Sequence, residues 1–183
     1  MNETLCLKTL FNPEKIMEEN FKEKLKKVRG FVLDCDGVLT NGQLLVMPDG
    51  EQLRSMNIKD GYAMQLAVKR GFQVTVISGG KSAGIPKRME GLGIKDVHMN
   101  VIDKAHVYDI MKIKHHIRDD EILVMGDDNP DITILKKCFV PTCPADAAHD
   151  VKQACIYVSP YKGGEGCVRD VIEQVMRAQG KWE

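Results

Sequence analysis

Short apolar runs alternate with amphipathic stretches along most of the chain. The apolar runs are typical of buried strands and cover residues 31–33, 73–77, 97–99, 121–125 and 138–141, with a weaker run at 156–158. Segments with helical features separate most of them, at 61–70, 82–92, 104–117, 130–136 and 147–154, and a last one covers 168–179. Strands that alternate with helices in this way predict an α/β fold, a doubly wound parallel sheet with helices on both faces.

Two segments depart from this alternation. Residues 13–27 are charged, and their apolar positions fall on one helical stripe, formed by Ile16, Met17, Phe21 and Leu25. Residues 40–58 contain two turn signals, Asn41-Gly42 and Asp49-Gly50, each followed by a short β-compatible run. These signals indicate a β-hairpin flap that projects from the first crossover. We therefore expect an N-terminal helical extension at 1–29 and one domain at 30–183, because the hairpin is too small to form a cap domain.

The composition is that of a soluble globular protein, and it narrows the classes of partner. Hydrophobic residues make up 43% of the 183 residues and charged residues 28%, which suffices for one buried core. The 26 basic residues are balanced by 26 acidic ones, whereas proteins that bind nucleic acid or an anionic membrane surface need a basic excess. We therefore expect neither nucleic acid nor a membrane as a partner.

The cysteines and the N-terminus bear on the cellular compartment. None of the six cysteines belongs to a C-x-x-C pair, and several lie in apolar segments, where a free thiol packs as a small hydrophobic group. The N-terminus lacks the basic start and apolar core of a signal peptide, and no apolar run approaches the ~20 residues of a membrane span. We expect reduced thiols and a cytoplasmic protein.

Polar residues with catalytic potential follow the predicted strands. Ligands of an open parallel sheet bind at the carboxyl ends of its strands. Asp34 and Asp36 follow the first strand, Ser78 follows the second, and Lys104 begins the helix after the third. The fourth is followed by the sequence GDDNPD, which contains Asp127, Asp128 and Asp131. We expect these side chains to meet at one edge of the sheet.

This set of residues indicates phosphoryl chemistry. Clustered carboxylates repel one another unless a cation is present, and oxygen ligands favour a hard ion such as Mg²⁺. A magnesium ion beside a lysine and a serine can neutralise and bind the oxygens of a phosphoryl group. One aspartate is then free to attack phosphorus, while the aspartate two residues later can handle the proton of the leaving group.

Each residue also has a simpler explanation when it is taken alone. Asp34 and Asp36 could be solvated acids at the end of a strand, and Ser78 could cap a helix. Lys104 could be an exposed helix residue, and Asp128 could be an N-cap without a role at a metal. Lys59 and Arg88 could belong to a solvated face. The simple explanations weaken when the motifs occur together and in order.

The motifs DCDGVLT, Ser78, Lys104 and GDDNPD, in this order, match those of the haloacid dehalogenase (HAD) superfamily of phosphatases. The hairpin and the sequences NIKDGYAM, PADA, GGEGCVRD and AQGK extend the match over residues 30–181. In these features the chain resembles the 3-deoxy-D-manno-octulosonate 8-phosphate phosphatase family, which serves lipopolysaccharide synthesis in Gram-negative bacteria. The resemblance implies a Mg²⁺-dependent phosphomonoesterase without a cap domain. It also implies a homotetramer, in which the hairpin and a neighbour's C-terminal tail help to close the active site.

The resemblance also implies a role for each matching residue. Asp34 would be the nucleophile that forms an aspartyl-phosphate, and Asp36 would protonate the leaving alkoxide and then activate water. Asp34, Asp127 and the backbone carbonyl of Asp36 would bind Mg²⁺. Asp128 and Asp131 would support this shell, with Asp131 holding Lys104. Ser78, the amide of Gly79 and Lys104 would hold the phosphoryl group. Candidates for binding the sugar or its carboxylate are Lys59, Asp60, Arg88 and residues 163–166.

The chain departs from the family pattern at positions that concern the sugar. The family usually has arginine at the positions of Gly80 and Lys59, and arginine or lysine at that of Glu165. A guanidinium binds a carboxylate through two nitrogens, which lysine and glycine cannot reproduce. The eight-carbon substrate is therefore the first expectation. A nine-carbon keto-deoxy sugar acid 9-phosphate, or a broader range of sugar phosphates, is the alternative.

Two further hypotheses belong to other classes of protein. A non-catalytic HAD-like oligomerisation module could share the fold, but such a module can lose its acids, whereas this chain retains Asp34, Asp36 and Asp127. A phosphotransfer receiver domain also uses an aspartate, Mg²⁺ and a lysine. Receivers lack an acid two residues after the phosphorylated aspartate, so the motif favours the phosphatase.

Overall fold

The computed structural model describes residues 21–182 and is built on a six-stranded parallel sheet. The strands are β1 (Gly30–Leu33), β4 (Gln73–Ile77), β5 (Asp96–His98), β6 (Ile122–Met125), β7 (Val140–Cys143) and β8 (Tyr157–Val158). Their order is β5-β4-β1-β6-β7-β8, so the chain first builds one side of β1 and then the other. The predicted doubly wound α/β sheet is confirmed.

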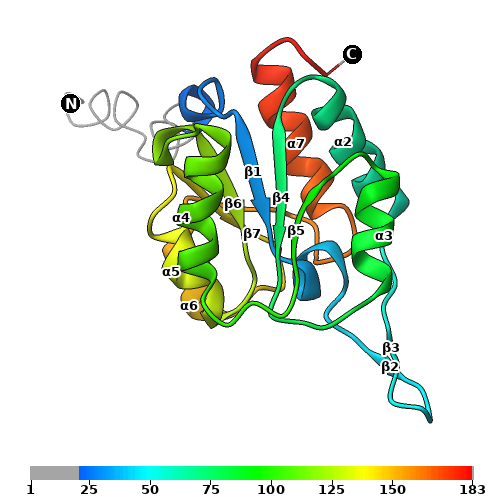
Figure 1. Ribbon diagram of the computed structural model, residues 1–183. Coiled ribbons are helices and arrows are strands. Elements are labelled where there is room, and N and C mark those ends of the chain that lie inside the picture. The colour runs from blue at the N-terminus through cyan, green and yellow to red at the C-terminus, as the bar shows by residue number, and fades with distance from the viewer. Residues whose placement is uncertain (1–20, 183) are drawn as a thin grey trace, which may run out of the picture.

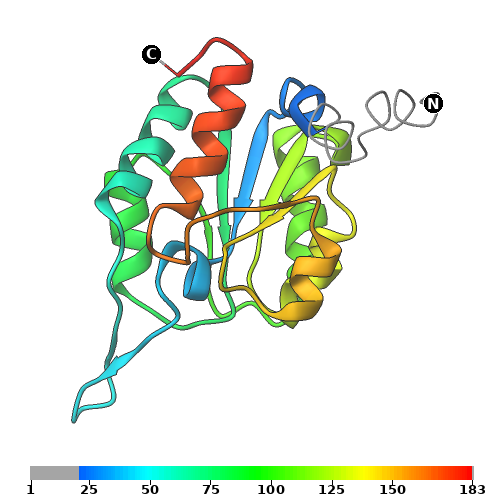
Figure 2. The same ribbon diagram turned by 180° about the vertical axis from the view of Figure 1, so that it is seen from behind.

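Helices cover both faces of the sheet. One face carries α2 (Ile58–Lys69), α3 (Gly84–Gly91) and α7 (Cys167–Ala178), and the other carries α4 (Lys104–His115), α5 (Ile132–Leu135) and α6 (His149–Ala154) (Figure 1, and from behind in Figure 2). Phe31 and Leu33 belong to the first core, whereas Val32 belongs to the second. Because β1 is buried on both faces, its sequence is a continuous apolar run rather than an alternating one.

Some element boundaries differ from the predicted ones for local reasons. Helix α2 begins at Ile58 rather than at residue 61, because Asn57 caps it by accepting a hydrogen bond from the backbone nitrogen of Lys59 at 2.8 Å. The predicted helix at 130–136 is a 3₁₀ turn, Asn129–Asp131, followed by the short helix α5. Strand β7 begins at Val140 rather than at residue 138.

The described end of the N-terminal extension packs against the domain. Residues 21–25 are helical, and Phe21, Leu25 and Val28 belong to the same core as β1 and α7. The ring of Phe21 stacks on that of Tyr157 with centroids 4.7 Å apart. The earlier part of the predicted helix 13–27 lies outside the described residues, so the division at residue 30 stays a prediction. Within residues 21–182, no helix is both long enough and apolar enough to span a membrane.

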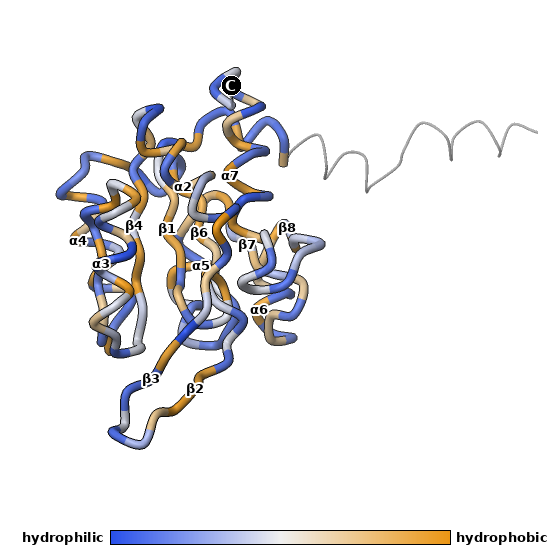
Figure 3. Tube along the Cα trace, turned by 90° about the vertical axis from the view of Figure 1, so that its right-hand side faces the viewer, coloured by the Kyte–Doolittle hydropathy of each residue, from blue (hydrophilic) through white to orange (hydrophobic). Residues whose placement is uncertain are grey.

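The predicted flap is a two-stranded antiparallel hairpin. It consists of β2 (Leu45–Val46) and β3 (Gln52–Leu53), in which Leu45 pairs with Leu53. The turn between the strands contains Asp49 and Gly50, as the sequence predicts. The hairpin projects beyond the carboxyl edge of the main sheet (Figure 1), and its strands carry apolar residues (Figure 3). The insertion between β1 and α2 contains no cap domain.

Candidate active site

The strand register brings the sequence motifs to one edge of the sheet. Leu33 of β1 pairs with Val76 of β4 on one side and with Met125 of β6 on the other. These three strands therefore end at the same level, and the residues that follow them share one edge. The strand order reverses at the junction of β1 and β6, which is where open α/β sheets bind ligands.

A buried lysine joins two of the predicted acids. The Nζ atom of Lys104, the first residue of α4, donates to Oδ1 of Asp34 at 2.8 Å and to Oδ1 of Asp131 at 2.6 Å. The three residues are 8%, 8% and 1% exposed. Burial alone would lower the pKa of Lys104, but the charges of Asp34 and Asp131 outweigh it and raise that pKa. Lys104 is therefore a cation, and its expected contact with Asp131 is present.

A third acid completes a compact carboxylate cluster. Asp34, Asp127 and Asp131 each offer an oxygen within 4.8 Å of the other two. Burial, followed by the charge of Asp131, raises the pKa of Asp34 to about 6, against the lowering effect of Lys104. Burial, followed by the charges of Asp34 and Asp131, raises the pKa of Asp127 to about 8. Three acids thus share the single ammonium group of Lys104, which is not enough positive charge to neutralise them all.

The hydrogen bonds distinguish the acids that could bind a cation from the acid that supports them. Asp131 uses Oδ1 for Lys104, and its Oδ2 accepts from the backbone nitrogens of Asp127 and Asp128 at 3.1 and 3.3 Å. Oδ1 of Asp127, in contrast, is buried without a hydrogen-bond partner. Such an oxygen beside the carboxylate of Asp34 fits a hard divalent cation.

A glycine allows the loop after β1 to approach this cluster. Residues Cys35–Leu39 form a single wide turn directly after Asp34, and Gly37 within it has φ +94°. A Cβ atom at Gly37 would lie 2.0 Å from Oδ2 of Asp127. Any other residue would therefore strain the backbone and push the loop away from Asp127.

The structure places Ser78 beneath the loop after β4. Ser78 is 1% exposed, and its Oγ accepts a hydrogen bond from the backbone nitrogen of Gly80 at 3.1 Å. Gly79, between them, is exposed. Asp128 is also exposed, and its side chain accepts from the backbone nitrogen of Asn129 at 2.8 Å, as an N-cap does. The phosphoryl-binding role of Ser78 and the metal-supporting role of Asp128 stay predictions.

Asp36 is paired with a residue that the sequence analysis did not single out. The Nε atom of Arg54 donates to Oδ1 of Asp36 at 2.6 Å, and a terminal guanidinium nitrogen donates to Oδ2 at 3.0 Å. Arg54 directly follows β3 of the hairpin. It is the single basic residue of segment 41–57, which is a signal that could have identified it.

The GGEGCVRD motif, which the PADA motif holds, contacts the loop after β1 rather than the carboxylate cluster itself. The backbone nitrogen of Gly163 donates to Asp146 of the PADA sequence at 3.0 Å, and that of Gly164 donates to the carbonyl of Val38 at 2.9 Å. A Cβ atom at Gly163 would lie 1.9 Å from the carbonyl oxygen of Gly37. The glycines of this segment therefore allow it to pack directly on the backbone of the loop.

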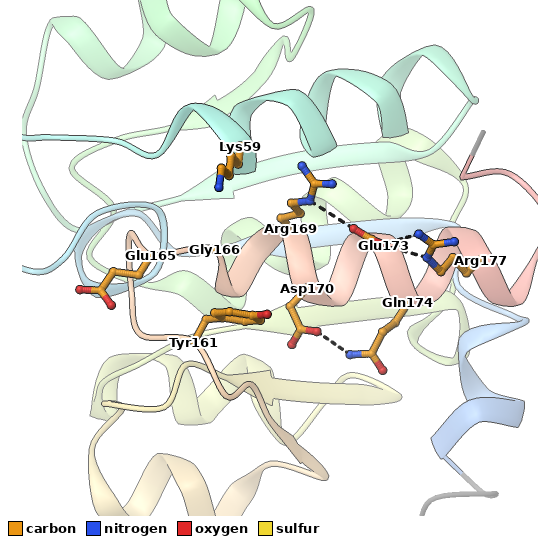
Figure 4. A pocket seen from close by; sticks show the side chains of 9 residues that line it. All are labelled: Lys59, Tyr161, Glu165, Gly166, Arg169, Asp170, Glu173, Gln174 and Arg177. Atoms are coloured by element: carbon orange, nitrogen blue, oxygen red, sulfur yellow. Dashed lines mark hydrogen bonds and ion pairs between the residues drawn. The ribbon is translucent and has the colours of Figure 1, made fainter.

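The candidate sugar-binding residues do not share one cavity. Lys59 and Glu165 line a cavity of about 440 Å³ beside α7 (Figure 4), whereas Arg88 lines another, of about 320 Å³, next to Arg54. Asp60 is 1% exposed and accepts from the backbone nitrogen of Arg169 at 2.7 Å, which fixes the start of α7. Binding of the sugar by these residues stays a prediction.

The chain is similar in sequence and in structure to known phosphatases. No family model matches the chain. The 3-deoxy-D-manno-octulosonate 8-phosphate phosphatase KdsC of Haemophilus influenzae is 32% identical over 161 residues, which are 87% of this chain and 89% of the relative. A Legionella pneumophila structure described as a HAD superfamily (subfamily III A) hydrolase has a TM-score of 0.90 at 30% identity, covering 92% of this chain and 93% of its own.

A further structure is similar to the chain and contains ligands. It is the 3-deoxy-D-manno-octulosonate 8-phosphate phosphatase of Moraxella catarrhalis in complex with a magnesium ion, a phosphate ion and a KDO molecule. Its TM-score is 0.86 at 25% identity, and the match covers 90% of this chain and 94% of that one.

Proposed function

This chain belongs to the 3-deoxy-D-manno-octulosonate 8-phosphate phosphatase family of the HAD superfamily, and we propose that it hydrolyses this phosphomonoester to the sugar acid and phosphate with Mg²⁺ as cofactor. The observation that carries the proposal is the buried network in which Lys104 bridges Asp34 and Asp131 beside Asp127. A cation and a lysine around one aspartate are the parts that phosphoryl transfer to a carboxylate requires.

Asp34 would act as the nucleophile. Its position is fixed by the end of β1 and by the hydrogen bond from Lys104 at 2.8 Å. Attack by a carboxylate oxygen forms the bond to phosphorus while the bond between phosphorus and the sugar oxygen breaks. Asp36 would donate a proton to that leaving oxygen, and would then take a proton from the water that hydrolyses the aspartyl-phosphate.

The residues present fit a magnesium ion. Asp34, Asp127 and the backbone carbonyl of Asp36 would hold it, while Asp131 orients the loop after β6 through the amides of Asp127 and Asp128. Bound Mg²⁺ supplies positive charge to the phosphate oxygens and to the clustered carboxylates. Lys104 adds a second positive charge at Asp34, which favours binding of the phosphate dianion.

The first test is phosphate release from 3-deoxy-D-manno-octulosonate 8-phosphate, with and without Mg²⁺, for the wild type and for Asp34→Asn. We expect metal-dependent release that the substitution abolishes. A nine-carbon keto-deoxy sugar acid 9-phosphate and an aryl phosphate are assayed beside it. A preference for the nine-carbon substrate would replace the proposed one, and inactivity on all three would favour the non-catalytic module.

We also propose that the enzyme is a cytoplasmic homotetramer that acts in lipopolysaccharide synthesis. The exposed apolar side chains of the hairpin support assembly, since Leu45 and Val46 are 63% and 64% exposed. The free cysteines of the described chain, namely Cys35, Cys138, Cys143, Cys155 and Cys167, are compatible with a reducing compartment.

A further inference from the structure

We propose that Arg54 is a specificity residue that binds the carboxylate of the acidic sugar phosphate, in exchange for Asp36, with which it is paired in the structure. The inference rests on the proposed function, because the exchange requires a substrate that carries a carboxylate in addition to its phosphate. It assigns to the hairpin a direct part in substrate recognition.

The ion pair between Arg54 and Asp36 uses both carboxylate oxygens. The two contacts measure 2.6 and 3.0 Å, and the other terminal nitrogen of Arg54 donates to the carbonyls of Gln52 and Lys81 at 3.1 and 3.3 Å. The side chain of Arg54 is 3% exposed. A shielded guanidinium of this kind is a two-nitrogen receptor whose matching ligand is a carboxylate.

This arrangement cannot persist through the proposed reaction. Asp36 has to approach the leaving oxygen of the sugar, yet both of its oxygens are bonded to Arg54. Asp36 is the more accessible partner, since its side chain is 32% exposed. The pair therefore has to open, and a guanidinium that loses a carboxylate needs another anion in its place.

Arg54 lies where a substrate anion could reach it. It lines two cavities at the hairpin, a first of about 430 Å³ and a second of about 320 Å³. Arg88 and Glu51 line the second cavity too, so two arginines and one acid border it. An anionic part of a substrate can form an ion pair with an arginine there, whereas a neutral sugar has no charge with which to do so.

Gly80 provides the space that the ion pair occupies. A Cβ atom at Gly80 would lie 2.6 Å from Oδ2 of Asp36 and 3.1 Å from a terminal nitrogen of Arg54. A side chain at position 80 would therefore displace the pair. In this chain the guanidinium beside Asp36 comes from the hairpin, and Gly80 leaves room for it there.

The exchange links recognition to catalysis. The carboxylate of the substrate binds the two nitrogens of Arg54 that Asp36 releases, so one ion pair replaces another. Asp36 is then free to turn toward the leaving oxygen. A phosphate ester without a carboxylate leaves the pair intact and reacts slowly, which makes Arg54 a determinant of selectivity for sugar acids.

The test compares an acidic with a neutral sugar phosphate. With Mg²⁺ present, kcat/KM is measured on two substrates, the acidic 3-deoxy-D-manno-octulosonate 8-phosphate and the neutral-sugar ester glucose 6-phosphate, for the wild type, Arg54→Gln and Arg54→Lys. We expect Arg54→Gln to reduce the ratio of acidic to neutral kcat/KM by about 30- to 100-fold, as a lost charged hydrogen-bond pair does. Arg54→Lys keeps the charge and should recover part of the ratio.

Two further variants make the test specific. Arg118→Gln removes an arginine that is 71% exposed and paired with Asp120, and it should leave the ratio unchanged. Arg54→Gln/Gly80→Arg returns a guanidinium from position 80, and it should restore the ratio at least tenfold over Arg54→Gln. If Arg54→Gln does not fold, Arg54→Lys alone should still lower the ratio about tenfold.

The outcomes separate this inference from the proposed function. A wild type that hydrolyses the acidic substrate, together with an Arg54→Gln variant that loses both activities equally, would overturn the exchange alone, because Arg54 would then act only by orienting Asp36. A wild type without activity on the acidic substrate would overturn the proposed function and the exchange together.

Discussion

Asp34 and Asp127 show how a buried carboxylate cluster affects the stability of the fold. Both are acids whose pKa is raised, to about 6 and about 8, chiefly by burial and then by neighbouring acids. Between pH ~4 and ~8 these two acids therefore bind more protons in the folded chain than in the unfolded chain, in which the pKa of aspartate is about 3.9. The free energy of unfolding of the metal-free protein should fall as the pH rises through this range.

Removal of the metal should therefore make the thermal stability depend on pH. In EDTA, we expect the Tm to fall by at least ~5 °C between pH 5 and pH 8, because the two carboxylates lose protons in a cluster whose one cation, Lys104, is already shared with Asp131. Saturating Mg²⁺ should raise the Tm, and more so at pH 8 than at pH 5, because the cation binds the charged form. Thermal melts followed by circular dichroism measure both effects.

The matched variant is Asp127→Asn, which removes one charge at nearly constant volume. It should flatten the pH dependence in EDTA and greatly reduce the stabilisation by Mg²⁺. A metal-free wild type whose Tm rises steadily from pH 5 to pH 8 would contradict the repulsion inferred for Asp34 and Asp127.

Lys104 carries the compensating charge, so its loss should affect both stability and rate. Lys104→Met leaves the buried carboxylates of Asp34 and Asp131 without their partner, at contacts of 2.8 and 2.6 Å in the wild type. We expect a loss of about 3 kcal/mol in the free energy of unfolding by urea denaturation. The kcat should fall about 10³-fold. Asp109→Asn removes an exposed partner of Lys137 instead, and should change neither quantity appreciably.

At the residue scale, the sequence predicts what directly follows the strands. Asp34 and Asp127 follow β1 and β6 closely, so the parallel sheet alone brings them together. The partner of Asp36 could not be predicted in this way. Arg54 reaches it from the hairpin, and its position depends on the path of an insertion rather than on the register of the sheet.

At the element scale, the apolar runs locate the strands well because a strand buried on both faces needs an uninterrupted run. The ends of the helices are harder to predict, since single side chains decide them. Asn57 starts α2, and Asp128 turns the chain into a 3₁₀ turn before α5. The packing of residues 163–166 on the loop after β1 could not be predicted from periodicity, because backbone contacts between distant loops leave no periodic signal in the sequence.

This packing leaves no room for even a methyl group at position 163. Gly163→Ala would place a Cβ atom 1.9 Å from the carbonyl oxygen of Gly37, so the loop after β1 has to shift. We expect kcat to fall at least ~100-fold, because displacement of the loop by about 1 Å misplaces Asp34 and Asp36.

Gly91→Ala is the matched control for this substitution. Gly91 lies at the end of α3, and a Cβ atom there would meet nothing within 4 Å. The variant should therefore retain the kcat of the wild type and be equally stable or more stable. Equal kcat values for Gly163→Ala and Gly91→Ala would show that residues 163–166 do not position the loop after β1.

At the scale of the whole molecule, the hairpin is the element that the single chain leaves unsupported. Its exposed apolar side chains include Leu44, Leu45, Val46, Met47 and Leu53, at 37% to 64% exposure. A two-stranded hairpin in water is at best marginally stable, and apolar patches on a projecting element favour burial against another molecule. Because Arg54 is anchored at the base of this hairpin, assembly and the ion pair with Asp36 should be coupled.

The last prediction concerns this coupling. By light scattering, the wild type should have four times the chain mass of 20.5 kDa. Leu45→Glu/Val46→Glu places charges on side chains that are more than 60% exposed in the single chain, so it should dissociate the assembly without lowering the stability of the core. Its kcat/KM should fall at least tenfold, since a mobile hairpin no longer holds Arg54.

Ile113→Glu on α4, at a residue that is 74% exposed, should leave both mass and activity unchanged. A wild type with the mass of one chain and full activity would contradict assembly through the hairpin, whereas a dissociated variant with full activity would show that the single chain fixes Arg54 by itself.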